Sequence, residues 1–284
     1  MPDPAPQPGQ AETFCGQPCI RLRARNGDTA LVALHGAQVL SWVSGGRERL
    51  YLSPNAVFDG QAAIRGGIPL CFPQFNQRGP LPKHGFARNL AWRAEGVQAE
   101  AGTARLVLHL EDDERTRTLW PQAFAARVDV ALSEGQLHVE CSVRNTGAVA
   151  WDFTIALHSY LRVDDIAQVG LQGLDGCARW DAVQDARGTQ QGTITFAGEY
   201  DSVFAAASAP LLLNDGAHRL EIAQSPALGQ TVVWNPGAAL CARLPDMPAD
   251  GHAHMLCVEA AQIDTPVLLA PGATWSGSQA LRVL

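Results

Sequence analysis

Long apolar runs are missing from this chain of 284 residues. No stretch approaches the roughly 18 apolar residues of a membrane-spanning helix, so we expect no contact with a membrane. The first residues, MPDPAPQPGQAE, lack the basic and apolar regions of a signal peptide. Their Pro and Gln content predicts a disordered lead over residues 1–14, in a protein that we expect to be cytoplasmic.

Positive charge is scarce as well. The chain has 21 Lys and Arg against 28 Asp and Glu, a net charge of −7, whereas a nucleic-acid-binding protein usually shows a basic face or a high pI. The Gly-rich phosphate loop of nucleotide-binding proteins is also absent, because Gly66-Gly67 alone is too short a match. We therefore expect neither a nucleic-acid partner nor a cofactor.

A disulfide framework is missing too. The 7 cysteines are an odd number without framework spacing, which predicts reduced thiols in a cytosolic protein. Cys15 and Cys19 have C-x₃-C spacing, but no second pair lies near them in the sequence, and a structural zinc site needs four ligands. His252 and His254 would share one face of a strand, yet no third ligand is identifiable. We expect no metal site.

Short apolar runs with a period of two recur from about residue 18 to the C-terminus. Leu106, Leu108 and Leu110 share one face of such a run, and residues 136–145 alternate in the same way. Asn26-Gly27, between two such runs, predicts a β-hairpin. Further strands are expected over residues 125–132, 151–163, 211–213, 219–223, 230–234, 255–260, 267–269 and 276–283.

Helical signals are few. Residues 112–119 carry acidic residues early and arginines late, as the helix dipole prefers, and Pro121 would end the helix. Many short strands separated by turn residues favour an all-β sandwich or barrel. No linker or internal repeat divides the chain, so we expect a single domain over residues 15–284 and a monomer.

A cationic segment over residues 65–88, RGGIPLCFPQFNQRGPLPKHGFAR, runs against the overall charge. Its prolines and glycines predict shaped loops between short strands rather than a helix. Several cations held on such loops are suited to binding a small anion such as a phosphate ester; the alternative is a set of solvated surface charges. The cations and the histidine are Arg65, Arg78, Lys83, His84 and Arg88.

Two titratable residues lie inside apolar strands. His158 shares a strand face with Thr154, Ala156 and Tyr160, so it could line a concave sheet as an acid or base, or be a hydrogen-bonded core histidine. Glu259 is the one carboxylate in the run MLCVEAA. It could mark a polar cavity where burial makes it a better base, or it could face outward near a strand end.

A third carboxylate, Asp201, lies in the segment GEYDSVF. It could accept hydrogen bonds from sugar hydroxyls, or it could be an ordinary turn residue.

Six segments in order resemble the aldose 1-epimerase superfamily and, within it, the hexose-6-phosphate mutarotases. The match covers nearly the whole chain. The resemblance implies a β-supersandwich of the galactose-mutarotase type that works without metal or cofactor. The segments are RGGIPLCFPQF from Arg65, PKHGFAR from Pro82, ALHSYLRV from Ala156, EYDSVF from Glu199, VVWNPG from Val232 and MLCVEAA from Met255.

The resemblance also implies roles for individual residues. His158 would be the general acid and Glu259 the general base for opening and closing the sugar ring. A hexose 6-phosphate, most simply glucose 6-phosphate, would be the small-molecule partner. The residues implied to bind it are Arg65, Lys83 and Arg88 at the phosphate, His84 in the site lining, Asp201 at the sugar hydroxyls and Gln74 in the site wall.

Three positions depart from the family pattern. Lys83 stands where many relatives have Gln, Asn76 where many have Gly, and Gly237 where Trp is frequent. The added charge of Lys83 favours a phosphate, and the other two would reshape the rim. Three alternatives stay open: a non-catalytic sugar-phosphate sensor, a mutarotase for free sugars, which would not need three cations, and a glycosidase, which usually needs two carboxylates.

Overall fold

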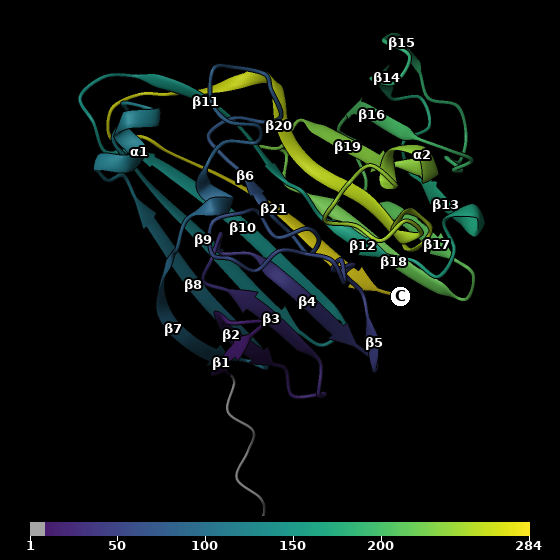
Figure 1. Ribbon diagram of the computed structural model, residues 1–284, viewed down its shortest axis with the longest axis horizontal. Coiled ribbons are helices and arrows are strands. Elements are labelled where there is room, and N and C mark those ends of the chain that lie inside the picture. The colour runs from purple at the N-terminus through teal and green to yellow at the C-terminus, as the bar shows by residue number, and fades with distance from the viewer. Residues whose placement is uncertain (1–8) are drawn as a thin grey trace, which may run out of the picture.

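The computed structural model describes residues 9–284, which fold into three antiparallel sheets (Figure 1). The first is a five-stranded meander. The other two have eight strands each and make up the sandwich. The prediction of an all-β sandwich is confirmed. The strands of the meander are β1 (Gly9–Phe14), β2 (Gln17–Arg23), β3 (Thr29–Ala33), β4 (Val39–Ser44) and β5 (Arg47–Glu48).

The second sheet has the strand order β13-β17-β18-β21-β10-β9-β8-β7. Its strands are β7 (Arg93–Glu100), β8 (Thr103–Glu111), β9 (Phe124–Ser133), β10 (Gln136–Asn145), β13 (Val169–Gln172), β17 (Leu211–Asp215), β18 (His218–Gln224) and β21 (Thr274–Val283).

The third sheet has the order β15-β14-β16-β19-β20-β11-β6, and β12 pairs with β20. Its strands are β6 (Leu70–Cys71), β11 (Trp151–Leu157), β12 (Tyr160–Arg162), β14 (Ala178–Asp181), β15 (Ala186–Thr189), β16 (Tyr200–Ala205), β19 (Gln230–Asn235) and β20 (Met255–Leu269).

Helices are short and lie outside the sheets. The predicted helix over 112–119 is α1 (Glu114–Leu119), and the Asp113 side chain caps its N-terminus by accepting a hydrogen bond from the Thr116 backbone N–H. No helix among the described residues is both long enough and apolar enough to cross a membrane. The remaining helical elements are α2 (Gly237–Cys241) and the 3₁₀ turns η1 (Ala87–Asn89), η2 (Ile166–Gln168) and η3 (Gly251–His254).

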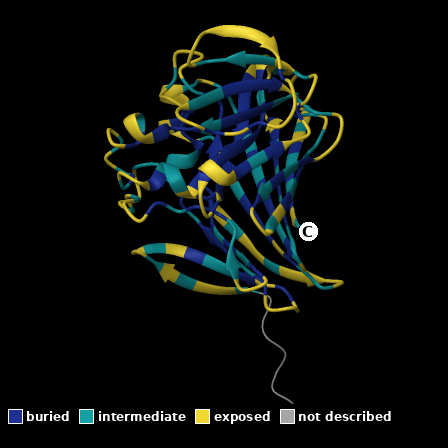
Figure 2. Cartoon of the chain, turned by 90° about the vertical axis from the view of Figure 1, so that its right-hand side faces the viewer, coloured by how far each residue is buried: buried dark blue, intermediate teal, exposed yellow. Residues whose placement is uncertain are grey.

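The sandwich core lies between the second and third sheets, where Figure 2 shows the buried strand segments gathered. Val258 and Ala260 of β20 belong to the same buried cluster as Leu106 and Leu108 of β8. Successive side chains of a strand point to opposite faces. Cys257, Glu259 and Ala261 therefore face away from this core, on the side of the third sheet that the candidate site occupies.

Three predicted boundaries are wrong. Residues 9–14 of the predicted lead form β1, which pairs along its length with β2; residues 1–8 lie outside the described part. The single strand expected over 151–163 is broken at His158, whose backbone N–H donates to the Pro69 carbonyl instead of a neighbouring strand. The two strands expected over 255–260 and 267–269 are one continuous strand, β20.

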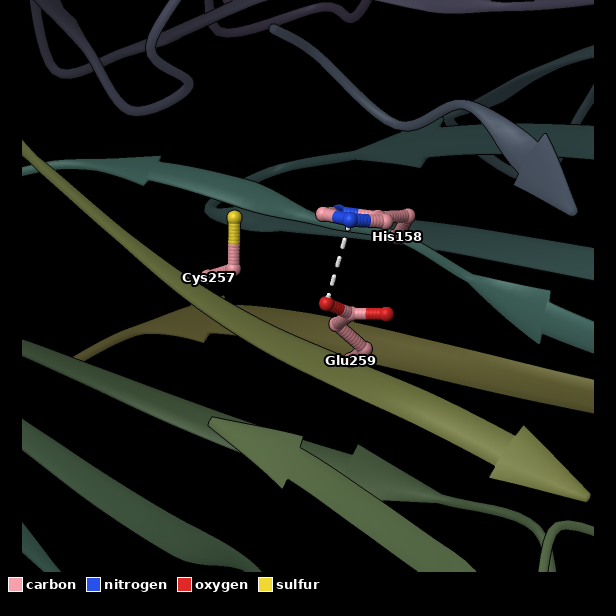
Figure 3. A group of neighbouring side chains, drawn as sticks. All are labelled: His158, Cys257 and Glu259. Atoms are coloured by element: carbon pink, nitrogen blue, oxygen red, sulfur yellow. Dashed lines mark ion pairs between the residues drawn. The ribbon is translucent and has the colours of Figure 1, made fainter. Parts of the chain in front are cut away.

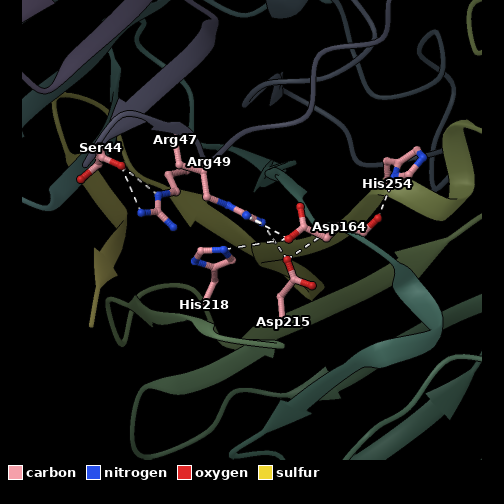
Figure 4. A network of polar contacts seen from close by, with 7 residues as sticks. All are labelled: Ser44, Arg47, Arg49, Asp164, Asp215, His218 and His254. Atoms are coloured by element: carbon pink, nitrogen blue, oxygen red, sulfur yellow. Dashed lines mark hydrogen bonds and ion pairs between the residues drawn. The ribbon is translucent and has the colours of Figure 1, made fainter.

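An ion-pair network ties the meander to the sandwich (Figure 4). Two guanidinium nitrogens of Arg47 each lie 2.9 Å from a carboxylate oxygen, one of Asp164 and the other of Asp215. The Asp215 carboxylate also accepts a hydrogen bond from the Asp164 backbone N–H at 3.0 Å. These contacts fix the segment that follows β12, and so help to hold β12 beside the site.

Candidate active site

Strand register places the candidate polar residues on one face of the third sheet. Asp201 on β16 lies opposite Trp234 on β19, Trp234 lies opposite Cys257 on β20, and Cys257 lies opposite Tyr160 on β12. Glu259 is two residues beyond Cys257 and so shares its face. Glu259 is 1% exposed. The alternative that this glutamate faces the solvent is therefore wrong.

His158 and Glu259 form a buried pair at the centre of this face (Figure 3). His158 Nε2 lies 3.2 Å from Glu259 Oε1. Burial raises the pKa of Glu259 well above its ordinary value and lowers the pKa of His158 well below its own. Glu259 Oε2 and His158 Nδ1 are buried without a hydrogen-bond partner among residues 9–284. The pair therefore has hydrogen-bonding capacity that the rest of this part of the protein does not satisfy.

Packing fixes the His158 ring. The Tyr160 ring is stacked on it, with ring centroids 4.8 Å apart and planes 11° apart. Arg65 Nη1 donates to the Tyr160 hydroxyl at 3.0 Å, and Arg65 Nε donates to Asp246 Oδ2, also at 3.0 Å. The Arg65 guanidinium thus links the segment after α2 to the tyrosine that orients His158, in addition to lining the site.

His84 presents one ring nitrogen to the site. Its Nδ1 accepts a hydrogen bond from the Asn76 backbone N–H at 3.3 Å and lies 3.2 Å from Cys71 Sγ. Because Nδ1 accepts, the proton of the neutral ring is on Nε2, which is left as a donor. Burial, followed by the charges of Arg88, Lys83 and Arg65, lowers the pKa of His84 to about 3, so the ring stays neutral at physiological pH.

These side chains line a cavity of about 250 Å³. Of the predicted site residues, Arg65, Lys83, His84, His158, Asp201 and Glu259 contribute to its wall. Burial raises the pKa of Asp201, and Glu199 adds to the rise. The structure thus brings together six of the eight residues named from the sequence, from segments that are far apart in the chain.

Gln74 and Arg88 are not among the lining residues. The Gln74 amide nitrogen donates to the carbonyls of Asn76 and Leu81, and its oxygen accepts from the Leu81 N–H, so its side chain braces the loop that leads to Lys83. The Arg88 guanidinium donates to the Lys83 carbonyl at 2.9 Å. Both residues thus support the loop that carries Lys83.

Sequence reasoning missed several parts of the wall. Arg78, which was noted only as a member of the cationic segment, lies over the Trp180 ring at 5.3 Å and forms an ion pair with Asp264. No local pattern marks these positions, because they come from strands and loops that meet only in the fold. The further lining residues are Phe75, Asn76, Trp180, Ala182, Glu199, Val203, Val232, Trp234, Leu240 and Leu244.

Two departures from the family pattern have local structural reasons. Asn76 has a φ of 50°, a left-handed conformation that Asn adopts more readily than most residues other than Gly. Gly237 has a φ of 60°, and a Cβ there would lie 2.5 Å from the Glu199 backbone nitrogen. The chain therefore passes too close to Glu199 for a side chain at residue 237.

Known proteins resemble this chain over most of its length. The family model "Aldose 1-epimerase" matches residues 18–282. Two curated relatives share the name "Putative glucose-6-phosphate 1-epimerase". The protein from Cenchrus ciliaris is 35% identical over 99% of this chain and 89% of its own length. The Escherichia coli K12 protein is 38% identical over 82% of this chain and 79% of its own length.

Solved structures agree. The crystal structure of "a putative mutarotase (YeaD)" from Salmonella typhimurium superposes with a TM-score of 0.89 at 30% identity, covering 97% of this chain and 93% of that one. A galactose mutarotase-like protein from Clostridium acetobutylicum, 15% identical, has the same fold with a TM-score of 0.76, covering 97% and 98% of the two chains. The fold is thus the predicted supersandwich of the galactose-mutarotase type, and the chain belongs to the aldose 1-epimerase family.

Proposed function

We propose that the protein interconverts the α and β anomers of a hexose 6-phosphate, with glucose 6-phosphate as the first candidate. The observation that carries the proposal is the buried pair of His158 and Glu259, 3.2 Å apart, in a cavity whose wall also holds Arg65, Arg78 and Lys83. The pair suits ring opening, and the cations suit the phosphate. The names of the relatives in C. ciliaris and E. coli agree with this substrate.

Ring opening needs one proton removed and one supplied. In the proposed reaction, the Glu259 carboxylate takes the proton of the C1 hydroxyl while the His158 imidazolium gives a proton to the ring oxygen. The C1–C2 bond of the open aldehyde then rotates, and the same groups reverse the steps on the other face. The direct contact of Nε2 with Oε1 allows the proton to return between the two groups after a turnover.

Burial makes each group more reactive in the charged state that the step uses, while it disfavours that state in the empty site. A carboxylate with a raised pKa is a stronger base, and an imidazolium with a lowered pKa is a stronger acid. After burial and the neighbouring His84, the charges of Arg88 and Arg65 also hold the pKa of His158 down. A bound phosphate dianion would offset those charges and favour the protonated imidazole, so a phosphorylated substrate would help to bring His158 into its working state.

His84 and Asp201 complete the proposed site. The Nε2–H of the neutral His84 is available to donate to a sugar oxygen, since Nδ1 is already used as an acceptor. Asp201 would accept from the sugar hydroxyls, and the ring of Trp234 offers an apolar wall for the C–H face of the sugar. Remote contacts of this kind hold C1 in place while the open chain rotates.

The proposal is tested by measuring α/β exchange with NMR saturation transfer on glucose 6-phosphate, with free glucose in parallel. We expect strong acceleration for the phosphorylated sugar and much less for glucose. Equal acceleration of both sugars would favour a mutarotase for free sugars. Binding of glucose 6-phosphate without any acceleration over buffer would leave a sugar-phosphate sensor.

Lys83 is expected to contribute to the choice of the phosphorylated sugar. The Lys83→Gln variant should lower kcat/KM for glucose 6-phosphate by about tenfold, as expected when a charge-assisted hydrogen bond is lost. The exchange of glucose should be unchanged. Arg187→Gln is a matched control, because Arg187 is an exposed cation near Trp180 that does not line the cavity. A Lys83→Gln loss that is equal for both sugars would contradict a role at the phosphate.

A further inference from the structure

We propose that His158, Cys257 and Glu259 also form a binding site for a thiophilic divalent cation such as Zn²⁺, and that the cation inhibits the enzyme when it binds there. Inhibition rests on the proposed function, whereas binding of the cation does not. This site differs from a resident metal cofactor, for which we found no motif among the residues. The cation would compete with the sugar for the acid and the base.

The fold places three different ligand types together. Cys257 and Glu259 are two residues apart on β20 and point to the same side, while His158 approaches from the break between β11 and β12 (Figure 3). One ligand atom from each residue lies within 4.8 Å of the other two. Nitrogen, sulfur and carboxylate oxygen are the atoms that Zn²⁺ selects in proteins.

The distances are close to those of a tetrahedral site. Zinc bond lengths of about 2.0–2.3 Å place neighbouring ligand atoms roughly 3.3–3.6 Å apart. His158 Nε2 and Glu259 Oε1 are already 3.2 Å apart. Cys257 Sγ lies within 4.8 Å of these two atoms, so it would have to move closer to complete the third corner. His158 and Glu259 line the cavity, so a water or a sugar hydroxyl at the fourth corner would come from that side.

Unused hydrogen-bonding capacity provides a second, independent observation. Glu259 Oε2 is buried without a partner among residues 9–284, although the carboxylate is 1% exposed. Of the residues in this part of the chain, only His158 forms an ion pair with Glu259. A divalent cation would supply the positive charge and the coordination that this buried carboxylate lacks.

The surroundings of His158 Nδ1 favour reversible binding of the cation. A metal-bound histidine normally donates its other ring N–H to a carboxylate or a carbonyl, which strengthens the site. His158 Nδ1 has no partner within residues 9–284. On binding, the cation would displace two protons to the solvent, that of the Cys257 thiol and the one that His158 Nε2 and Glu259 Oε1 hold between them, with no change in oxidation state. It would occupy Nε2 and Oε1 and so remove both groups needed for ring opening.

The test uses the whole protein with Co²⁺ as a spectroscopic probe and Zn²⁺ as the inhibitor. Wild type should show visible bands of tetrahedral Co²⁺ and a near-ultraviolet thiolate-to-cobalt band. Cys257→Ser should lose the thiolate band, keep its basal exchange and raise the Zn²⁺ concentration for half inhibition by at least about tenfold. Cys141→Ser, which changes another fully buried thiol on β10, should behave as wild type.

The outcomes separate this proposal from the proposed function. Absence of the thiolate band in wild type, or the same Zn²⁺ sensitivity in wild type and Cys257→Ser, would overturn the cation site. A band that disappears in Cys257→Ser, in a protein without exchange activity, would support the cation site and refute the mutarotase.

Discussion

The Glu259→Gln variant is expected to exchange the anomers of glucose 6-phosphate about a thousandfold more slowly than wild type. The carboxylate that accepts the C1 hydroxyl proton is replaced by an amide of the same shape, which cannot accept that proton. Binding of glucose 6-phosphate should persist, since the cations of the wall are unchanged. NMR saturation transfer gives the rate, and titration calorimetry gives the affinity.

Stability makes this variant informative. Burial disfavours the charged form of Glu259, so a neutral amide is expected to leave the free energy of unfolding equal or higher, in line with the usual conflict between stability and catalysis. A loss of activity in a protein that is at least as stable would therefore locate the effect in the chemistry. His158→Asn should show a similar loss, as the partner in the same proton transfer.

Two controls complete the experiment. Glu221→Gln removes a carboxylate that pairs with Arg282 on the outside of the second sheet, and it should exchange glucose 6-phosphate as fast as wild type. A Glu259→Gln enzyme that keeps more than about a tenth of the wild-type rate would show that another group is the base, because loss of a general base costs at least about a hundredfold.

The Gly85→Ala variant is expected to lose more than about 4 kcal/mol of unfolding free energy, the range reached when backbone strain and a core clash combine. Gly85 has a φ of 70°, and a Cβ would lie 2.1 Å from the Phe72 carbonyl oxygen and 2.7 Å from the Pro73 nitrogen. That oxygen also accepts hydrogen bonds from the Phe86 and Ala87 N–H groups, so it cannot move freely. Urea unfolding of the two proteins measures the difference.

Gly216→Ala separates the clash from the conformational strain. Gly216 has a φ of 59° in the turn between β17 and β18, and a Cβ there meets nothing within 4 Å. This variant should lose only about 1 kcal/mol, the cost of a left-handed conformation for a residue with a Cβ. Equal losses in the two variants would show that the close approach of Gly85 to Phe72 does not matter.

The Gly85 contact also bears on the site. His84 precedes Gly85, has a φ of 65° itself, and depends on this turn to place Nδ1 near the Asn76 N–H. Any Gly85→Ala protein that folds is therefore expected to exchange anomers slowly, because the loop that carries Lys83 and His84 must shift.

Much of the fold was predictable because strands leave a strong local signal. The alternation of Leu106, Leu108 and Leu110 correctly identified β8 and its buried face, and Asn26-Gly27 correctly marked the hairpin between β2 and β3. The errors fall where pairing partners override local pattern. At the break, the His158 N–H donates to the Pro69 carbonyl. Strand β1 forms because it can pair with the edge of β2.

The site was predictable to the extent that a polar residue in an apolar run is conspicuous. Glu259 in MLCVEAA and His158 in ALHSYLRV stood out for that reason, and both are buried in the cavity wall. Arg65 and Arg88 stood out as cations, but their partners were invisible in the sequence. Arg65 is paired with Asp246, 181 residues away, and Arg88 donates to the Lys83 carbonyl.

Composition and alternation were enough to predict the all-β class, the short strands and the polar residues of the third sheet, because both are local properties of each segment. Which of those residues meet depends on the tertiary structure. Strand register and packing between distant segments bring His158 into contact with Glu259 and place Cys257 beside both. They also pair Arg65 with Asp246 and with the Tyr160 hydroxyl. Those contacts depend on the free energy of the whole fold, which no single segment encodes.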